Sequence, residues 1–248
     1  MDVVIRRKKI EGIPLLELSP ADIIKHPLVL MIHGYGNRKD FMLNQGYFLA
    51  SQGYMVALPD AWGHGERSPG GIPNFFEAVQ KTADEIDTII DYYKEISYAG
   101  AERIGLVGYS MGGCVVYEFV CRPGCRAKAA AAVIGTPDWV SLMSMPATAQ
   151  LFLQYGLITS PDDMQALVGL AGRIHPAAKA ENARVPLLML NGADDPLMDV
   201  PPIKTFAGQL TQRRGEDGTV RLSVYPGVGH ADTVEMNVEI AMWFANYL

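Results

Sequence analysis

This sequence has few cysteines and few charged residues, and it contains no long hydrophobic run. Three cysteines among 248 residues are too few, and odd in number, for the disulfide framework of a small secreted protein. No stretch reaches the roughly 18 consecutive apolar residues that a membrane-spanning helix needs. The first residues lack the apolar core and the cleavage site of a secretion signal. These absences predict a cytoplasmic protein without a membrane segment.

Clusters of basic residues and of metal ligands are missing as well. The formal net charge is -6, and the run from Arg6 to Lys9 is the only basic run of its kind. Nucleic acids and anionic membranes are bound by clustered Lys and Arg, so we expect neither as a partner. Cys121 and Cys125 have no His or Asp cluster nearby that would complete a zinc site. We therefore predict no metal and no cofactor.

What the chain does contain is the alternation typical of a single α/β domain, here covering residues 1–248. Hydrophobic residues make up 49% of the sequence, enough for a large core. Apolar runs alternate with segments of helical spacing, which predicts a doubly wound, mostly parallel sheet of about eight strands. The predicted strands cover residues 3–10, 15–18, 27–32, 54–58, 103–107, 129–134, 185–190 and 221–225. The predicted helices cover residues 40–51, 73–93, the segment after Ser110, 201–210 and 232–248.

One segment interrupts this alternation. Residues 135–181 have no strand pattern, and a plain crossover needs far fewer residues. We interpret residues 137–180 as a small helical cap inserted into the domain. Peripheral packing is the alternative, and an apolar patch over residues 139–157 would also suit the surface of a homodimer. The sequence leaves open whether the protein is a monomer or a homodimer.

The sequence Gly108-Tyr109-Ser110-Met111-Gly112 lies between a predicted buried strand and a predicted helix. A serine in a tight strand-to-helix turn has its hydroxyl exposed at the edge of the sheet, and the flanking glycines let strand and helix approach each other. This arrangement predicts that Ser110 is a nucleophile.

A serine nucleophile needs a base, and the base needs an acid that orients it. His230 lies in a glycine-rich loop before the last helix and is the predicted base. Asp195 follows a predicted strand and is the predicted acid. Its neighbour Asp194 and the nearby Asp199 remain alternatives. The order Ser, Asp, His is that of α/β-hydrolases.

An oxyanion hole needs two backbone N–H groups that face the developing negative charge. We expect one from Met111, the residue after the nucleophile, and the other from Tyr35, with Gly36 as the alternative. His33, at the start of the same loop, is interpreted as a residue that braces the loop through hydrogen bonds.

Together these motifs resemble the α/β-hydrolase superfamily, and more narrowly the compact bacterial carboxylesterases related to dienelactone hydrolases and to prolyl-oligopeptidase catalytic domains. The resemblance covers nearly the whole chain: His33 to Gly36, Leu58 to Arg67, the serine turn, and the loops of Asp195 and His230. It implies a structural role for His64. Dienelactone hydrolases proper have a cysteine at the position of Ser110, and prolyl peptidases have a large propeller that is missing here.

The resemblance and the three candidate residues predict a serine carboxylesterase that acts on small esters with short to medium acyl chains. A thioesterase or deacetylase with the same triad, a non-catalytic ligand sensor, and a lyase or cofactor-free haloperoxidase are the alternatives. Trp62, Trp139, Met143 and Met198 are the predicted substrate-binding residues, with Met145 and Phe152 as further candidates for an apolar lining.

Overall fold

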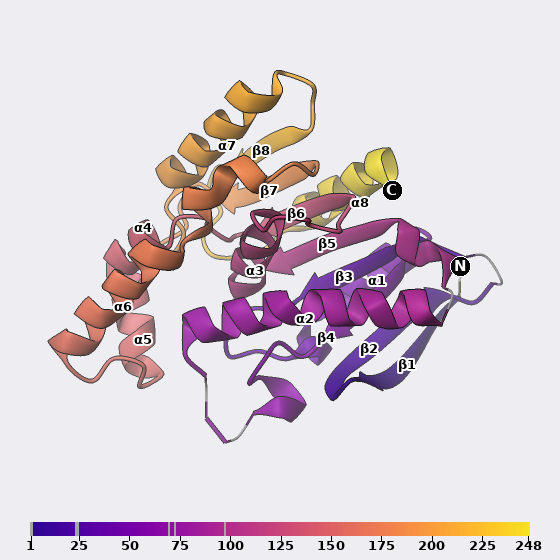
Figure 1. The fold of residues 1–248 in the computed structure, drawn as a ribbon, viewed down its shortest axis with the longest axis horizontal. Coiled ribbons are helices and arrows are strands. Elements are labelled where there is room, and N and C mark those ends of the chain that lie inside the picture. The colour runs from indigo at the N-terminus through magenta and orange to yellow at the C-terminus, as the bar shows by residue number, and fades with distance from the viewer. Residues whose placement is uncertain (1, 23–24, 69, 72, 97) are drawn as a thin grey trace.

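A computed structural model describes residues 2–22, 25–68, 70–71, 73–96 and 98–248, and eight strands in this part of the chain form one sheet (Figure 1). The strands are β1 (Val3–Ile10), β2 (Ile13–Pro20), β3 (Leu28–Ile32), β4 (Met55–Pro59), β5 (Ile104–Tyr109), β6 (Ala129–Val133), β7 (Leu187–Gly192) and β8 (Val220–Tyr225). Their order in the sheet is β1-β2-β4-β3-β5-β6-β7-β8. The pairs β1–β2 and β2–β4 are antiparallel, and all pairs from β4 to β8 are parallel. The predicted mostly parallel sheet is confirmed.

The burial of the strands follows their place in the sheet. Every residue of the five strands from β3 to β7 is buried, as expected for parallel strands covered by helices on both faces. The edge strand β1 holds the basic run from Arg6 to Lys9, and Lys8 forms an ion pair of 2.6 Å with Glu17 of β2. The only basic run of the sequence therefore lies on an edge strand, where charged side chains oppose pairing with other chains.

Helices cover both faces of the sheet and bury two apolar clusters. The larger cluster includes side chains of α2 (Phe75–Glu95), α3 (Met111–Val120) and α7 (Val200–Arg214). On the opposite face α1 (Leu43–Ser51) and α8 (Val234–Tyr247) contribute to the second cluster. The α2 helix begins where Asn74 accepts hydrogen bonds from the N–H groups of Phe76 and Glu77, at 3.0 and 3.2 Å. This cap satisfies backbone donors that have no partner within the helix.

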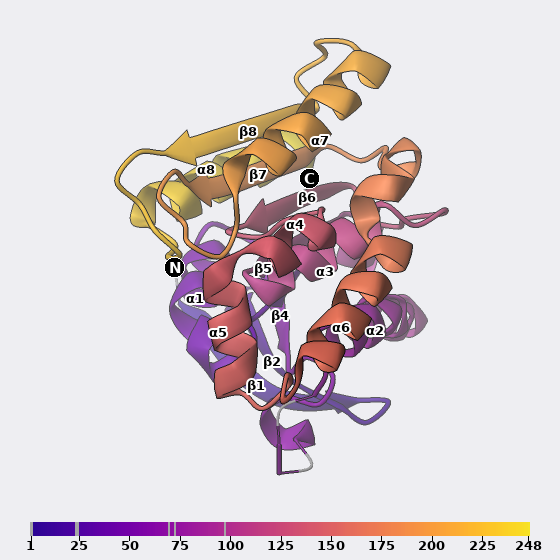
Figure 2. The same cartoon turned by 90° about the vertical axis from the view of Figure 1, so that its left-hand side faces the viewer.

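Residues 135–181, predicted to contain no strand, form helices. They are α4 (Trp139–Ser144), α5 (Pro146–Gln154) and α6 (Pro161–Ile174), followed by most of a 3₁₀ segment (Pro176–Asn182). The helices gather at the end of the sheet toward which β5 points (Figure 1) and form a group in front of that end in the second view (Figure 2). Ligands of open parallel sheets bind at the carboxyl ends of the strands, so this group of helices adjoins the expected site. Across the part of the chain that the structure describes, no helix combines the length and apolar character needed to cross a membrane.

Candidate active site

Ser110 lies in the turn between β5 and α3, in a backbone conformation unusual for serine. Its φ is 57° and its ψ is -114°, which is a strained combination for a residue with a side chain. A Cβ on Gly108 would lie 2.1 Å from the carbonyl oxygen of Gly112, and a Cβ on Gly112 would lie 2.2 Å from that of Ile32. Only glycine fits at both positions, and the two glycines allow the strand and helix contacts that hold Ser110 in this turn.

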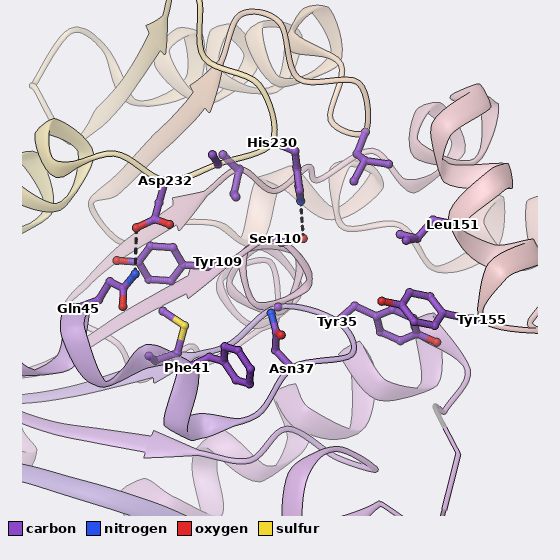
Figure 3. A pocket seen from close by; sticks show the side chains of 15 residues that line it. Tyr35, Asn37, Phe41, Gln45, Tyr109, Ser110, Leu151, Tyr155, His230 and Asp232 are labelled. Carbon is purple, nitrogen blue, oxygen red and sulfur yellow. Dashed lines mark hydrogen bonds between the residues drawn. The ribbon is translucent and has the colours of Figure 1, made fainter.

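The structure brings Ser110, His230 and Asp195 into one chain of hydrogen bonds. The Oγ of Ser110 lies 2.8 Å from Nε2 of His230 (Figure 3), and Nδ1 of His230 lies 2.8 Å from Oδ2 of Asp195. The other oxygen of Asp195 accepts hydrogen bonds from the N–H groups of Leu197 and Met198, at 2.8 and 3.0 Å. An ionised carboxylate can only accept hydrogen bonds. This geometry therefore suits the His230 tautomer that donates from Nδ1 to Asp195 and accepts from the serine hydroxyl at Nε2.

The two alternative acids lie elsewhere. Asp194 is exposed, and its backbone N–H donates to the carbonyl oxygen of Val228 at 3.0 Å. Asp199 is also exposed and directly precedes α7. The side chain of Asp195, by contrast, is fully buried against His230.

Two elements that adjoin Ser110 carry the backbone N–H groups expected to form the oxyanion hole. Met111 is the first residue of α3, and N–H groups of a first helical turn have no acceptor within their helix. The loop after β3 passes close to the serine, because a Cβ on Gly34 would lie 3.5 Å from the Cβ of Ser110. Tyr35 follows in this loop, and its phenol donates to the carbonyl oxygen of Pro73 at 2.5 Å.

His33 is buried beneath the same loop and hydrogen-bonds on both sides of its ring. Its Nδ1 donates to the carbonyl oxygen of Gly34 at 2.8 Å, and its Nε2 accepts from the N–H of Ala61 at 2.9 Å. Burial lowers the pKa of His33 to about 4, so the ring is neutral near pH 7 and keeps Nε2 as an acceptor. Because the peptide unit is planar, the bond to Gly34 also fixes the direction of the N–H of Tyr35.

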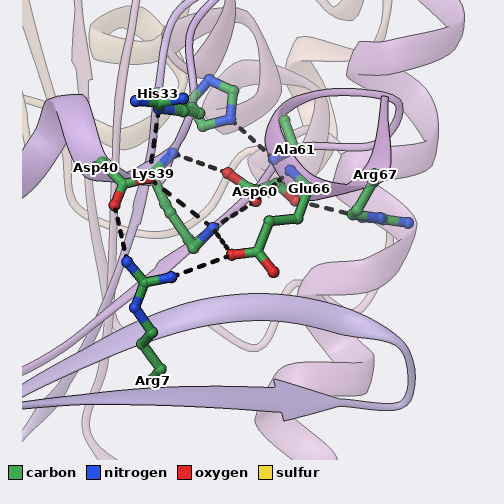
Figure 4. A network of polar contacts seen from close by, with 9 residues as sticks. Arg7, His33, Lys39, Asp40, Asp60, Ala61, Glu66 and Arg67 are labelled. Atoms are coloured by element: carbon green, nitrogen blue, oxygen red, sulfur yellow. Dashed lines mark hydrogen bonds and ion pairs between the residues drawn. The ribbon is translucent and has the colours of Figure 1, made fainter. Parts of the chain in front are cut away.

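A buried ion pair fixes the far end of the loop (Figure 4). Lys39 Nζ lies 2.7 Å from Oδ2 of Asp60 and 2.6 Å from Oε1 of Glu66, and the N–H of Lys39 donates to Oδ1 of Asp60 at 2.9 Å. Burial by itself would lower the pKa of Lys39 and raise that of Asp60. The hydrogen bonds between them outweigh burial, so the pKa of Lys39 is raised and that of Asp60 is lowered. Both groups therefore stay charged, and the loop is anchored at both ends.

His64, for which the resemblance implies a structural role, is buried beside this loop. Its Nδ1 hydrogen-bonds to the carbonyl oxygen of Trp62 at 2.9 Å, and burial lowers its pKa. Its ring centroid lies 5.4 Å from those of His33 and Tyr35. His64 thus packs behind the loop and does not line the cavity beside Ser110.

A cavity of about 340 Å³ opens beside Ser110 and His230. Its walls come from the loop after β3, from α1 and the segment before it, from α5, and from the loops that hold Asp195 and His230. The lining side chains that the sequence analysis did not single out are Asn37, Phe41, Met42, Gln45, Tyr109, Ile134, Leu151, Tyr155, Leu197, Ala231 and Asp232. Two of these could have been found from the sequence, because Asn37 directly follows the loop from His33 to Gly36 and Asp232 follows His230 after one intervening residue.

None of the four predicted substrate-binding residues is among the described residues that line this cavity. Trp139, Met143 and Met198 are buried in the larger apolar cluster, where Trp139 stacks on Phe76 at a centroid distance of 5.2 Å. Trp62 packs against the same cluster, with Nζ of Lys81 3.9 Å from its ring centroid. Large apolar side chains gain more from full burial than from lining an open cavity, which explains their place in the core.

Within the described ranges, no group of three or more His, Cys, Asp or Glu side chains is arranged to hold a metal ion. Cys121 is buried and Cys125 is partly buried, and both remain free thiols. Burial raises the pKa of Cys121 to about 12 and that of Cys125 to about 11, so neither is an activated thiolate at pH 7.

Comparison with known proteins finds a matching family and similar folds. The model of the dienelactone hydrolase family matches residues 14–240. YitV of Bacillus subtilis, described as a candidate esterase, is 27% identical over 230 residues, which are 86% of this chain and 87% of YitV. The structure of TT1662 from Thermus thermophilus has a TM-score of 0.79 at 21% identity and covers 100% of this chain and 98% of its own. An acylaminoacyl peptidase of Pyrococcus horikoshii has a TM-score of 0.73 at 18% identity, and 100% of this chain corresponds to 41% of the peptidase.

Proposed function

This chain belongs to the dienelactone hydrolase family and is a hydrolase of the carboxylic-ester class, and we propose that Ser110, His230 and Asp195 are its catalytic triad. One observation carries the proposal: Ser110 Oγ, in a strained turn, lies 2.8 Å from a histidine whose other nitrogen lies 2.8 Å from a buried carboxylate. This is the arrangement that converts a serine hydroxyl into a nucleophile.

In the proposed reaction, Ser110 Oγ attacks the ester carbonyl carbon while His230 Nε2 takes the hydroxyl proton. Asp195 holds His230 in the required tautomer and stabilises the imidazolium that forms. The tetrahedral intermediate collapses as His230 gives the proton to the leaving alkoxide, which departs as the alcohol. Water then attacks the acyl-enzyme with His230 again as base, and the acid is released.

The N–H groups of Met111 and Tyr35 are the proposed oxyanion donors. Removing one such donor typically costs about 2.7–4 kcal/mol of transition-state stabilisation. The hydrogen bond from His33 to Gly34 supports this assignment for Tyr35, because it holds the peptide group that carries the N–H. The Lys39–Asp60 ion pair also supports the assignment of Tyr35, because it anchors the end of the loop that carries Tyr35.

We further propose that residues 137–180 are a cap over the site and that the site takes short to medium acyl chains. Leu151 and Tyr155, at the end of α5, line the cavity beside Ser110, which gives these helices a direct place at the site (Figure 3). The cavity of about 340 Å³ lies at the lower end of the range typical for ligand pockets. The four predicted pocket residues Trp62, Trp139, Met143 and Met198 are not part of this proposal.

The test is hydrolysis of p-nitrophenyl esters from acetate to palmitate by the wild-type protein and by Ser110→Ala. We expect turnover to be highest for the short chains, because the cavity is small, and to disappear in the variant, because the nucleophile is gone. A folded Ser110→Ala protein that retains wild-type turnover would refute the catalytic assignment. Equal or better turnover of palmitate would refute the chain-length assignment alone.

A further inference from the structure

The cavity beside Ser110 has two chemically different sides. Leu151 and Tyr155 form an apolar side, whereas Asp232, Gln45 and Tyr109 lie on the other side of the serine (Figure 3). If the proposed function holds, one side takes the acyl group and the other takes the alcohol. The apolar side suits a hydrocarbon acyl chain, which leaves the polar side for the alcohol.

Asp232 is held in place with one oxygen left over for a ligand. Its Oδ2 accepts hydrogen bonds from the side-chain amides of Gln45 and Asn237, both at 3.1 Å. Asn237 is fixed in turn by the phenol of Tyr109, which donates to its Oδ1 at 2.6 Å. Within the described part of the chain no hydrogen bond reaches Oδ1 of Asp232, so this oxygen can accept from a bound molecule.

Gln45 offers a second acceptor next to the first. Its Nε2 is used by Asp232, but its Oε1 is buried and has no hydrogen-bond partner among the described residues. Buried polar atoms almost always have a partner, and an exception calls for an explanation. A hydroxyl group of a bound alcohol would supply the missing hydrogen once the Gln45 side chain turns to expose this atom to the cavity.

The polar side continues beyond the first cavity. A second cavity, of about 320 Å³, shares Gln45 and Asp232 with it. Its other lining residues are the polar Asn44, Thr233 and Asn237 and the apolar Phe48 and Val234. At the lip of the first cavity the ring of Phe41 is 63% exposed, which offers a flat apolar surface to the C–H groups of a ligand. Acceptors, amides and an exposed ring together suit a molecule that has many hydroxyl groups on a carbon skeleton.

The charges around the cavity narrow the class of alcohol further. None of the described residues that line the first cavity is Lys or Arg, so a carboxylate or phosphate on the alcohol would face Asp232 without a counterion. Arg38 lies outside this lining, where its guanidinium pairs with Asp40 at 3.5 Å and lies 5.8 Å from the centre of the Phe41 ring, so a cationic alcohol stacked on that ring would meet a like charge. A neutral alcohol fits both surroundings.

We propose that this site takes esters of neutral, hydroxyl-rich alcohols such as sugars, whose hydroxyl groups donate to Asp232 and Gln45. This inference rests on the proposed ester hydrolysis and adds the class of alcohol to it.

The test compares the acetates of two primary alcohols with rings of equal size, 6-O-acetylglucose and cyclohexylmethyl acetate, which differ in the ring oxygen and the hydroxyl groups. We expect the wild-type protein to have the higher kcat/KM for the sugar ester. In Asp232→Ala the ratio of the two values should fall about tenfold or more, because a hydrogen bond to a charged group is lost. In the near-isosteric variant Gln45→Met the ratio of the two kcat/KM values should fall by a smaller factor. Taking the ratio within each variant cancels any general loss of activity or folding. The control is Asp162→Asn, an exposed substitution that should leave the ratio unchanged.

Each result has a separate meaning for the two proposals. Two results would overturn the inference and leave the proposed ester hydrolysis intact: equal kcat/KM of the wild-type protein for cyclohexylmethyl acetate and the sugar ester, or an unchanged ratio in the variants. A clear preference for acetylcholine over its neutral isostere 3,3-dimethylbutyl acetate would overturn it in favour of a cationic alcohol. Failure on every ester, short p-nitrophenyl esters included, would refute the proposed function itself.

Discussion

At the scale of single residues, Asp194 and Asp195 show how neighbours in sequence acquire different roles. The Asp195 side chain is buried and faces His230, with two backbone N–H groups on its other oxygen. Asp194 points into solvent. The turn that follows β7 separates them, because Leu197 and Met198 donate to Asp195 alone.

Asp195→Asn should therefore reduce the kcat of ester hydrolysis by a factor on the order of 10⁴, since an amide no longer selects the required tautomer of His230. Asp194→Asn is the matched control and should keep wild-type kcat. The measurement is steady-state hydrolysis of p-nitrophenyl acetate. Equal losses in the two variants would mean that the acid has been assigned wrongly.

At the scale of elements, the site depends on how closely β5 and α3 approach each other. Gly108 lets β5 touch the backbone of α3 at Gly112, and Gly112 lets α3 touch the end of β3 at Ile32. Gly192 does the same at the end of β7, where a Cβ would lie 2.1 Å from the carbonyl oxygen of Val228 in the loop that leads to His230. Gly108 and Gly112 thus shape the serine turn, and Gly192 brings the end of β7 close to the histidine loop.

Gly108→Ala should lower the free energy of unfolding by about 3 kcal/mol, because its Cβ meets backbone that cannot yield easily. Gly208→Ala is the control: a Cβ at this exposed position of α7 meets nothing within 4 Å. This second change should raise stability by up to about 1 kcal/mol, because alanine loses less entropy in a helix. Urea unfolding of both variants gives the comparison, and a Gly108→Ala protein as stable as the wild type would contradict the packing argument.

At the scale of the whole molecule, the sheet and the proximity of the three candidate residues were predictable from the sequence for a physical reason. Fully buried strands are continuous apolar runs, and their pattern differs from the periodicity of helices. Each strand from β3 to β7 could therefore be predicted separately. The serine turn, the Asp195 loop and the His230 loop each follow a strand, and parallel strands bring their carboxyl ends together. Local sequence patterns were therefore enough to predict that these residues, which are far apart in the chain, lie close together in the fold.

The pocket was not predictable in the same way. Trp139 and Met143 have the composition of an apolar lining, but the orientation of α4 turns them into the core. Leu151 and Tyr155 reach the cavity only because of how α5 packs at the end of the sheet. Which face of a short helix meets the site depends on packing between distant segments, and periodicity alone carries no such information.

Whether His230 activates Ser110 is decided by mass spectrometry of peptides after reaction of the protein with a fluorophosphonate. Such reagents form a stable bond with an activated serine. We expect the label on the peptide that contains Ser110 in the wild-type protein, and a large decrease in labelling in His230→Gln. A label on another residue, or an unlabelled Ser110 in a protein that hydrolyses p-nitrophenyl acetate, would contradict this activation.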